Sequence, residues 1–277
     1  MISINPIDLI LWTFRRNEKD VVNLYNTLSP VMQLATGGSM LNFGYWSSKH
    51  NDPISAQNNL CMIFANLAEL SSGKNVVDVG SGLSAPSKLW QTTFPNLNLY
   101  DVNINLNQLS FSGHQKNIEF IDSTSTSLPF TNDSVDRVLA LESAQHFKPL
   151  DNFISEAKRI LTESGLLVMA LPVTTENSSF GKLGVLKFTW SSEHYDVNYL
   201  KNLILSFGFT ISDEKLIGSN VYGPLTDYYV EHRKDLKNLI LKNYSSYVEK
   251  ILFNSLQKMK KASDENIIDY VLLKCHL

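Results

Sequence analysis

Cysteine is scarce in this sequence: only Cys61 and Cys275 occur in 277 residues. Two distant cysteines make neither a disulfide framework nor a zinc site, and they fit a reducing compartment. Long apolar runs are also missing, since none approaches the ~20 residues that a membrane span needs. Residues 1–14 lack the basic segment of a signal peptide, and Asp8 interrupts their apolar residues. We therefore expect a cytoplasmic protein without a membrane span.

An excess of basic residues is absent as well. The chain has 24 Lys and Arg against 27 Asp and Glu, which leaves a formal net charge of −3. A protein that neutralises several phosphates usually carries a basic excess, so we expect a small-molecule partner and not nucleic acid. No His, Asp or Glu residues have the spacing of metal ligands, and no metal is expected. The sequence leaves the oligomeric state open.

Short apolar segments alternate with helical patterns along most of the chain. Helices are expected at 18–36, with an interruption near Pro30, at 55–70 with Ser55 as N-cap, and at 84–94, 150–161 and 197–209. Strands are expected at 75–80, 97–104, 118–122, 136–143, 165–172, 209–217 and 267–275. This alternation predicts an α/β fold: a doubly wound, Rossmann-like, mostly parallel seven-stranded sheet with helices on both faces.

The pattern also predicts how the chain is divided. We expect an N-terminal helical lid segment over residues 1–72 and a ligand-binding domain over residues 73–277. Two stretches, 173–195 and 219–262, would be cap insertions between strands. Ligands bind beyond the carboxyl ends of the strands in such sheets, so lid and cap would cover the ligand.

The strongest local motif is Val76-Val77-Asp78-Val79-Gly80-Ser81-Gly82, a strand that enters a tight glycine turn before a helix. Glycines let the backbone turn sharply and approach a ligand, and the helix N-terminus offers free N–H groups. Gly80, Gly82 and Ala85 also satisfy the dinucleotide pattern, so a nicotinamide-dependent oxidoreductase stays an alternative. The Asp78 carboxylate favours a ligand with a cationic amino group, because it would repel a pyrophosphate.

Four further segments accompany this motif: LNFGYW (41–46), NINLNQL (103–109), IDSTSTSLPF (121–130) and ESAQHF (142–147). In this order and spacing, the five segments resemble the class I methyltransferases that use S-adenosylmethionine (SAM). The likeness is greatest to their small-molecule branch, with tocopherol, sugar O- and isoprenoid C-methyltransferases. It covers about residues 20–175 and implies SAM as the cofactor.

The resemblance also implies roles for individual residues. The methionine end of SAM would lie at Asp78, Gly80, Ser81 and Gly82, its ribose at Asn103, Ile104 and Gln108, and its adenine at Asp122 and Ser123; Leu141 would pack near the sulfonium, and Tyr25 and Asn42 would close over the cofactor. Two positions depart from the family pattern. Asn103 replaces the usual ribose-binding acid, unless Asp101 takes that role, and Ser84 replaces a glycine.

Methyl transfer needs the acceptor in line with the S–CH₃ bond and water excluded, and a base helps when the acceptor is a hydroxyl. His146 is the candidate base, and Glu142 would orient it or act on the substrate. The alternatives for His146 are a pocket wall without proton transfer and a remote structural role.

Aromatic residues suggest that the substrate is a small apolar or aromatic molecule. The methyl group of SAM would be transferred to a C, O or N atom of this molecule by in-line displacement. Tyr45, Trp46, Trp190 and Tyr229 are the candidate substrate contacts, and packing of the lid on the core is the alternative for them. Two other functions stay open besides the oxidoreductase. One is a methyltransferase that acts on RNA or protein, and the other is a SAM-fold protein that binds ligands or catalyses without methylating.

Overall fold

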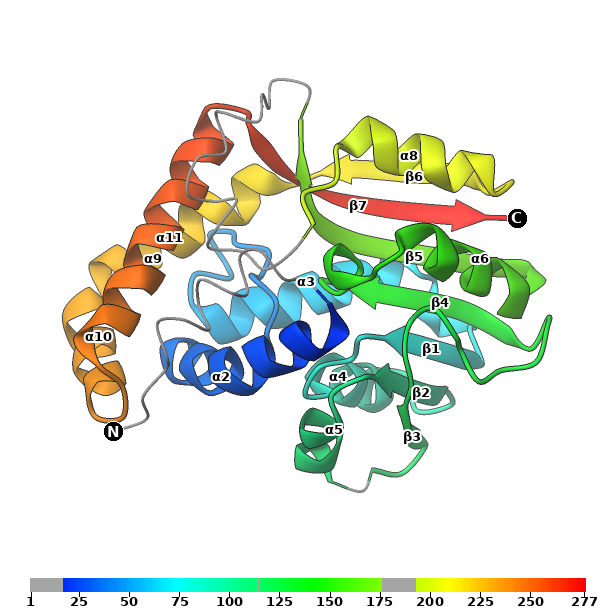
Figure 1. Ribbon diagram of the computed structural model, residues 1–277, viewed down its shortest axis with the longest axis horizontal. Helices are drawn as coiled ribbons and strands as arrows, with labels where there is room; N and C mark the ends of the chain where they lie inside the picture. Colours follow the sequence, from blue (N-terminus) through cyan, green and yellow to red (C-terminus); the bar gives the residue numbers. More distant parts are fainter. Residues whose placement is uncertain (1–16, 114, 176–192) are drawn as a thin grey trace.

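A seven-stranded sheet forms the centre of the computed structural model, which describes residues 17–113, 115–175 and 193–277 (Figure 1). The strands follow the order β3-β2-β1-β4-β5-β7-β6. Their bounds are β1 Asn75–Val79, β2 Asn98–Asn103, β3 Ile118–Asp122, β4 Val135–Leu141, β5 Leu161–Thr174, β6 Thr210–Leu216 and β7 Ile268–His276. Neighbours from β3 to β5 pair in parallel, whereas β7 runs antiparallel to β5 and β6. The predicted mostly parallel sheet is confirmed.

Helices cover both faces of this sheet. The α-helices are α2 Glu18–Thr36, α3 Pro53–Leu67, α4 Ala85–Thr93, α5 Leu106–Ser112, α6 Leu150–Ile160, α8 Val197–Ser206, α9 Tyr222–Glu231, α10 Arg233–Leu241 and α11 Ser246–Asp264. Three short 3₁₀ turns are η1 Leu70–Ser72, η2 Ala144–His146 and η3 Gly218–Asn220. None of the helices that the structure describes is long and apolar enough to cross a membrane.

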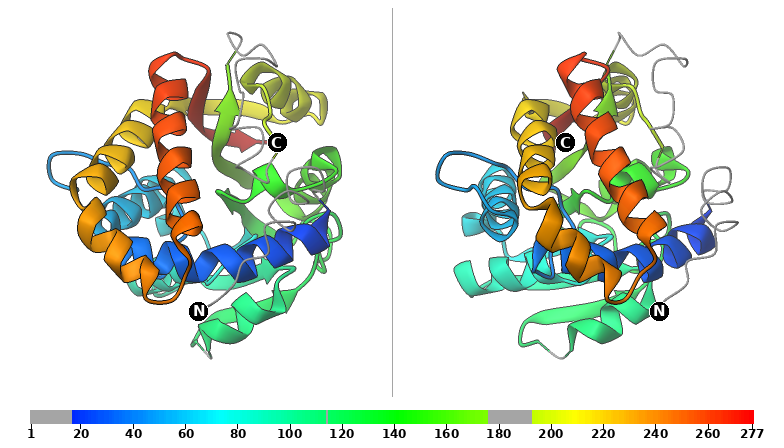
Figure 2. Two further views of the ribbon diagram at one scale, coloured as in Figure 1. Left: turned by 60° about the vertical axis from the view of Figure 1, so that its left-hand side comes forward. Right: turned by 90° about the vertical axis from the view of Figure 1, so that its left-hand side faces the viewer.

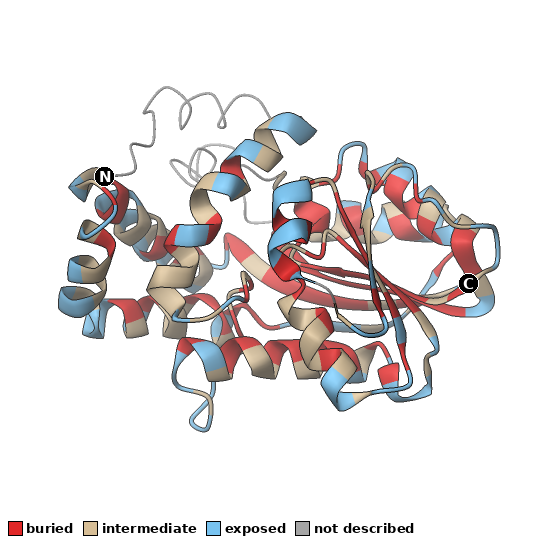
Figure 3. Ribbon diagram, turned by 90° about the horizontal axis from the view of Figure 1, so that it is seen from below, coloured by how far each residue is buried: buried red, intermediate tan, exposed pale blue. Residues whose placement is uncertain are grey.

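Two hydrophobic layers separate along the strands because successive side chains point to opposite faces. In β1, Val76 packs in one layer with Phe64 of α3 and Trp90 of α4. Its neighbour Val77 packs in the other layer, with Phe153 of α6. Burial is concentrated along the strands and the inner helix faces (Figure 3). Because helices cover both faces of the sheet, β1, β4 and β5 consist mainly of apolar residues.

The segment between β6 and β7 forms a helical cap at one end of the molecule. It contains α9, α10 and α11, and α2 crosses beside them (Figure 2). Leu24 and Val31 of α2 pack with Ile240, Tyr244 and Val248 in a separate small core. The predicted insertion 219–262 corresponds to this cap. Of the other predicted insertion, residues 176–192 lie outside the described residues.

Two local predictions were wrong. Helix α2 continues through Pro30 without interruption, because its buried residues on both sides of Pro30 pack against the cap and offset the lost backbone hydrogen bond. The N-cap of α3 is Asp52 and not Ser55. Asp52 accepts from Ser55 N–H at 3.0 Å, and Pro53 occupies the first turn, where no N–H is needed.

Candidate active site

The glycine turn after β1 lies so close to the segment after β4 that no side chain fits at Gly80. Gly80 has φ +78°, and a Cβ at this position would lie 2.5 Å from Cβ of Ser143, which follows β4. Ser84, two residues past Gly82, also takes a left-handed conformation, with φ +56°, and is completely buried. A non-glycine residue in this conformation costs about 1–2 kcal/mol, which the surrounding packing must offset.

A cavity opens at the carboxyl ends of β1, β2, β3 and β4. It lies where the chain order reverses between β1 and β4, the usual ligand position in a doubly wound sheet. Of the predicted site residues, the cavity is lined by Tyr25, Asn42, Gly80, Ser81, Gly82, Asn103, Ile104, Gln108, Ser123, Leu141, Glu142 and His146. The tertiary structure thus brings together residues from six separate sequence segments.

Asp78 lies behind the glycine turn and does not line the cavity. It faces Asp101 across the β1–β2 pair, and Ser87 Oγ lies 2.6 Å from Asp101 Oδ1 and 3.3 Å from Asp78 Oδ2. Burial, followed by repulsion from Asp101, raises the pKa of Asp78 well above its usual range. Burial raises the pKa of Asp101 to about 6. Because two adjacent buried carboxylates repel each other, the pair retains a proton at mildly acidic pH.

Asn103, and not Asp101, reaches the cavity from β2. Its Nδ2 donates to the Gly82 carbonyl at 3.1 Å and to Gln108 Oε1 at 3.0 Å. These bonds connect the glycine turn to α5. Asp122, at the end of β3, is exposed and does not line the cavity, although the adjacent Ser123 does.

His146 and Glu142 line the cavity just after β4. Nε2 of His146 lies 2.8 Å from the Tyr25 hydroxyl, which comes from α2. Glu142 Oε1 accepts from the Phe43 N–H at 2.8 Å and from the Tyr270 hydroxyl at 3.0 Å. Burial raises the pKa of Glu142 to about 8. Segments that are far apart in the sequence therefore meet at these two residues.

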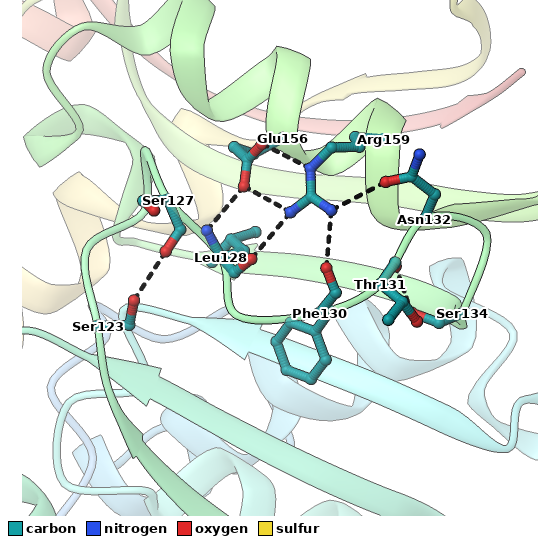
Figure 4. Close-up of polar contacts among 9 residues, drawn as sticks. All are labelled: Ser123, Ser127, Leu128, Phe130, Thr131, Asn132, Ser134, Glu156 and Arg159. Atoms are coloured by element: carbon teal, nitrogen blue, oxygen red, sulfur yellow. Dashed lines mark hydrogen bonds and ion pairs between the residues drawn. The ribbon is translucent and has the colours of Figure 1, made fainter.

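The loop between β3 and β4 is fastened by Arg159 of α6, a residue that the sequence analysis did not single out. Its guanidinium donates to the carbonyls of Leu128 and Phe130 at 2.9 and 2.7 Å, and it pairs with Glu156 (Figure 4). Glu156 in turn accepts from the Leu128 N–H at 2.8 Å. The same loop carries Ser123 and Ser125 into the cavity. An Arg on the inner face of the predicted helix 150–161 was the available signal.

Comparison with known proteins agrees with this geometry. A methyltransferase domain model matches residues 77–169, from β1 through most of β5. Erythromycin 3''-O-methyltransferase from Saccharopolyspora erythraea is 25% identical over 266 residues, which cover 87% of this chain and 86% of that protein. The chain is a class I methyltransferase. This family decides in favour of a methyl donor over the dinucleotide alternative.

Solved structures show the same fold. The crystal structure of the [4+2]-cyclase SpnF has a TM-score of 0.76 at 18% identity, over 94% of the methyltransferase and 96% of the cyclase. Geranyl diphosphate C-methyltransferase from Streptomyces coelicolor, in complex with Mg²⁺, geranyl diphosphate and S-adenosyl-L-homocysteine, has a TM-score of 0.73 at 12% identity. That similarity covers 94% of this methyltransferase and 97% of the Streptomyces enzyme.

The cavity of the methyltransferase fits an amino-acid nucleoside. Ser81 lines it, is 6% exposed, and its Oγ has no hydrogen-bond partner among the described residues. A buried hydroxyl without a partner is costly, so a polar ligand group at the turn would satisfy it. The carboxamides of Asn103 and Gln108 supply donors and acceptors of the kind that hydroxyl groups of a ribose need. The described residues contain no group of three or more His, Cys, Asp or Glu side chains that could hold a metal ion.

Three of the predicted substrate contacts do not line the cavity of the methyltransferase. Trp46 is buried, and its Nε1 donates to the Phe43 carbonyl at 3.0 Å. Tyr229 is part of the core beneath the cap, and Tyr45 packs against the same core. Trp190 lies outside the described residues. For Tyr45, Trp46 and Tyr229, the structure therefore favours the packing alternative.

Proposed function

We propose that the protein transfers the methyl group of SAM to an oxygen atom of a small, apolar or aromatic molecule by in-line displacement. The observation that carries the proposal is one continuous cavity. It joins the glycine turn, where the Ser81 hydroxyl has no partner in the part of the chain that the structure describes, to the His146–Tyr25 pair. Transfer to a carbon or nitrogen atom is the variant of the same proposal that needs no strong base.

The cofactor residues follow from the cavity walls. Gly80, Ser81 and Gly82 would hold the methionine end, with Asp78 acting through the turn. Asn103, Ile104 and Gln108 would bind the ribose, Ser123 the adenine, and Leu141 would lie near the sulfur. Tyr25 and Asn42 would close the cavity from the lid segment 1–72. The cofactor, when bound, supplies an already activated methyl group. The protein then has to position the acceptor, which contributes up to about 7–11 kcal/mol in favourable cases.

His146 would accept the proton of the acceptor hydroxyl. Burial raises the pKa of the Tyr25 phenol well above its usual range, so Tyr25 remains a hydrogen-bond donor. In the tautomer whose Nε2 carries no hydrogen, Tyr25 donates to the Nε2 lone pair of His146, and both side chains line the cavity. An acceptor hydroxyl that takes the place of the Tyr25 hydroxyl at Nε2 can pass its proton to this nitrogen. General base catalysis of this kind contributes about 10²–10⁴-fold.

The name of the bacterial relative favours an oxygen acceptor. The similarity to erythromycin 3''-O-methyltransferase covers 87% of this chain. A sugar-bearing or polycyclic molecule with a free hydroxyl is therefore the first substrate class to test. Apolar walls formed by Val21, Val22, Leu41 and Phe147 would take the non-reacting part of such a molecule.

A second candidate function is catalysis or binding without methyl transfer. The fold similarity to the [4+2]-cyclase SpnF, over 94% of this chain, favours it. Such a protein would bind the cofactor without consuming it. The two candidates therefore differ in one measurable quantity, the release of S-adenosylhomocysteine.

The first experiment titrates the purified protein with S-adenosylhomocysteine and with NADH by calorimetry. We expect S-adenosylhomocysteine alone to bind, and Gly80→Val and Asp78→Ala to weaken it by more than tenfold. Binding of NADH, or of neither ligand, contradicts the proposal.

The second experiment incubates labelled SAM with phenols, amines, isoprenoids and hydroxylated glycosides. His146→Ala should slow transfer to hydroxyl groups by about 10²–10⁴-fold while leaving the affinity for S-adenosylhomocysteine within twofold. Transfer that is unaffected in His146→Ala rejects the base assignment. A substrate consumed without any S-adenosylhomocysteine would instead support the non-methylating candidate.

A further inference from the structure

Glu142 is a carboxyl group held over the cavity by an unusual backbone. It follows β4 directly, lines the cavity, and has φ +52°, which is a left-handed conformation. Such a conformation at a non-glycine residue costs about 1–3 kcal/mol and is retained where the surroundings enforce it. Here the Phe43 N–H and the Tyr270 hydroxyl hold Oε1 from two different sides. The direction of the carboxyl is therefore set by the lid segment and by β7 together.

The groups that surround Glu142 are neutral acids. Burial raises the pKa of Tyr25 of α2, Cys61 of α3, Tyr222 of α9 and Tyr270 of β7, and the Glu142 charge raises each of them further. The two hydrogen bonds that lower the pKa of Glu142 come from an amide and a phenol, which carry no charge. The carboxylate is thus solvated by neutral donors, and burial raises its pKa to about 8. A cation placed in the cavity would reverse this shift.

The sheet order indicates where a cationic centre of the cofactor would lie. The nucleoside-binding residues proposed above, Asn103 and Ser123, stand at the ends of β2 and β3. A cofactor bound by these residues and by the glycine turn would extend over β1 toward β4, because the turn follows β1 and β4 is the next strand in the sheet. The backbone there is close: Gly80 approaches Ser143, the residue after Glu142, so nearly that no Cβ fits. The sulfur between the nucleoside and the methionine end would therefore face the end of β4.

We infer that Glu142 is the residue by which this site distinguishes the positively charged methyl donor from its neutral demethylated product. The inference rests on the proposed function. The ionised carboxylate attracts a sulfonium in the poorly solvated cavity, whereas the thioether of S-adenosylhomocysteine carries no charge for it to attract. Glu142 is thus a specificity-determining residue for the cofactor and, through the difference between donor and product, for product release.

Proton exchange follows from this assignment. Below about pH 8 the ligand-free carboxyl holds a proton, and binding of the donor releases that proton to the solvent. Loss of the positive charge after methyl transfer makes the carboxylate unfavourable again, so Glu142 takes up a proton from the solvent. Charge is balanced at each step, and the product leaves a site that no longer attracts it.

The test measures the Kd of SAM and of S-adenosylhomocysteine by calorimetry between pH 6 and pH 9. Both ligands carry the same amino-acid and nucleoside groups, so effects of the Asp78–Asp101 pair cancel in the ratio of the two Kd values. The preference for SAM is the Kd of S-adenosylhomocysteine divided by the Kd of SAM. In the wild type this ratio should increase by up to about tenfold per pH unit and level off near pH 8. At pH 7 binding of SAM should release close to one proton, measured as the difference in enthalpy between Tris and phosphate buffers.

Two variants separate Glu142 from other titrating groups. Glu142→Gln should bind S-adenosylhomocysteine as the wild type does, but its preference for SAM should be lower and independent of pH. Tyr270→Phe removes one donor to Oε1, so the increase in preference should move to higher pH. This second variant and the wild-type proton release decide the question if Glu142→Gln does not fold.

A pH-independent ratio in the wild type, or an unchanged pH dependence in Glu142→Gln, overturns the inference and leaves methyl transfer intact. Failure of both ligands to bind the wild type overturns the proposed function instead. The two failures are therefore distinguishable in one set of titrations.

Discussion

At the scale of single residues, the site depends on where a side chain cannot fit and on where a charge is placed. Gly80 is excluded from having a Cβ by Ser143, and Asp78 is forced against Asp101 by the register of β1 and β2. Neither property can be recognised from the residue type alone. Both lead to measurable consequences.

Gly80→Ala tests the close approach. The new Cβ must take a left-handed conformation and displace Ser143, so we expect a loss of about 2–4 kcal/mol in the free energy of unfolding. Urea denaturation measures it. Gly113→Ala is the matched control, because Gly113 also has positive φ, +68°, but has no atom within 4 Å of its would-be Cβ. Equal losses in the two variants would show that conformation alone, and not the contact, requires Gly80.

Asp101→Asn tests the buried carboxyl pair. A carboxyl whose pKa is raised in the folded state lowers stability as pH increases from the unfolded value near 4 to the folded value of about 6, and the full cost persists above it. The variant removes this cost and can still accept the bond from Ser87. We therefore expect it to be more stable than the wild type by about 1–3 kcal/mol at pH 8, and nearly equal at pH 4.

Thermal denaturation at the two pH values checks this prediction. The exposed Asp264→Asn serves as the control, and it should change stability little. A stabilisation by Asp101→Asn that is as large at pH 4 as at pH 8 would contradict the account.

At the scale of elements, sequence patterns predicted the strands well and the helix ends less well. β3 lies at the predicted residues, 118–122, because a short apolar strand between polar loops has few alternative bounds. β5 is longer than its predicted 165–172, since its pairing with β7 extends the strand to Thr174. α2 passes through Pro30 because packing against the cap outweighs the local preference. At β5 and α2, contacts between distant segments therefore outweighed local propensity.

Arg159→Ala tests how α6 positions the loop before β4. The variant loses the bonds to the carbonyls of Leu128 and Phe130, and we expect about 1.5–3 kcal/mol less stability. The affinity for S-adenosylhomocysteine should decrease about five- to tenfold, because the same loop carries Ser123 and Ser125. Calorimetry measures the stability and the affinity of Arg159→Ala against those of Lys158→Ala, whose exposed amine donates to the Phe207 carbonyl. An affinity loss equal to that of Lys158→Ala would exclude the positioning role.

At the scale of the whole molecule, side-chain hydrogen bonds connect α2 to the segments that follow β2 and β3. Ser29 accepts from Gln108 Nε2 at 3.1 Å, Asn26 accepts from Asn105 at 3.0 Å, and Glu18 accepts from Thr124. Gln108 is itself bound to Asn103. A ligand that orders Asn103 and Gln108 should therefore also stabilise α2.

Hydrogen exchange measures this connection. S-adenosylhomocysteine should slow amide exchange in α2 by at least tenfold while leaving α8, on the other face of the sheet, within twofold. Ser29→Ala should reduce the protection of α2. Thr27→Ala is the matched control, since the Thr27 hydroxyl bonds only within its own helix, to the Asn23 carbonyl. Equal protection in both variants would mean that the lid closes independently of Gln108.

The sequence by itself determined the strand–turn–helix unit around Gly80, the alternation that builds the sheet, and twelve of the residues that line the cavity. These features depend on neighbouring residues, through side-chain periodicity and turn chemistry. Only the tertiary structure decided that Asp101 faces Asp78, that Tyr25 meets His146 across 121 residues, and that Glu142 is held by Tyr270 across 128 residues. The reason is physical: which way a side chain faces, and what charge it carries there, depends on packing between segments that are distant in the chain.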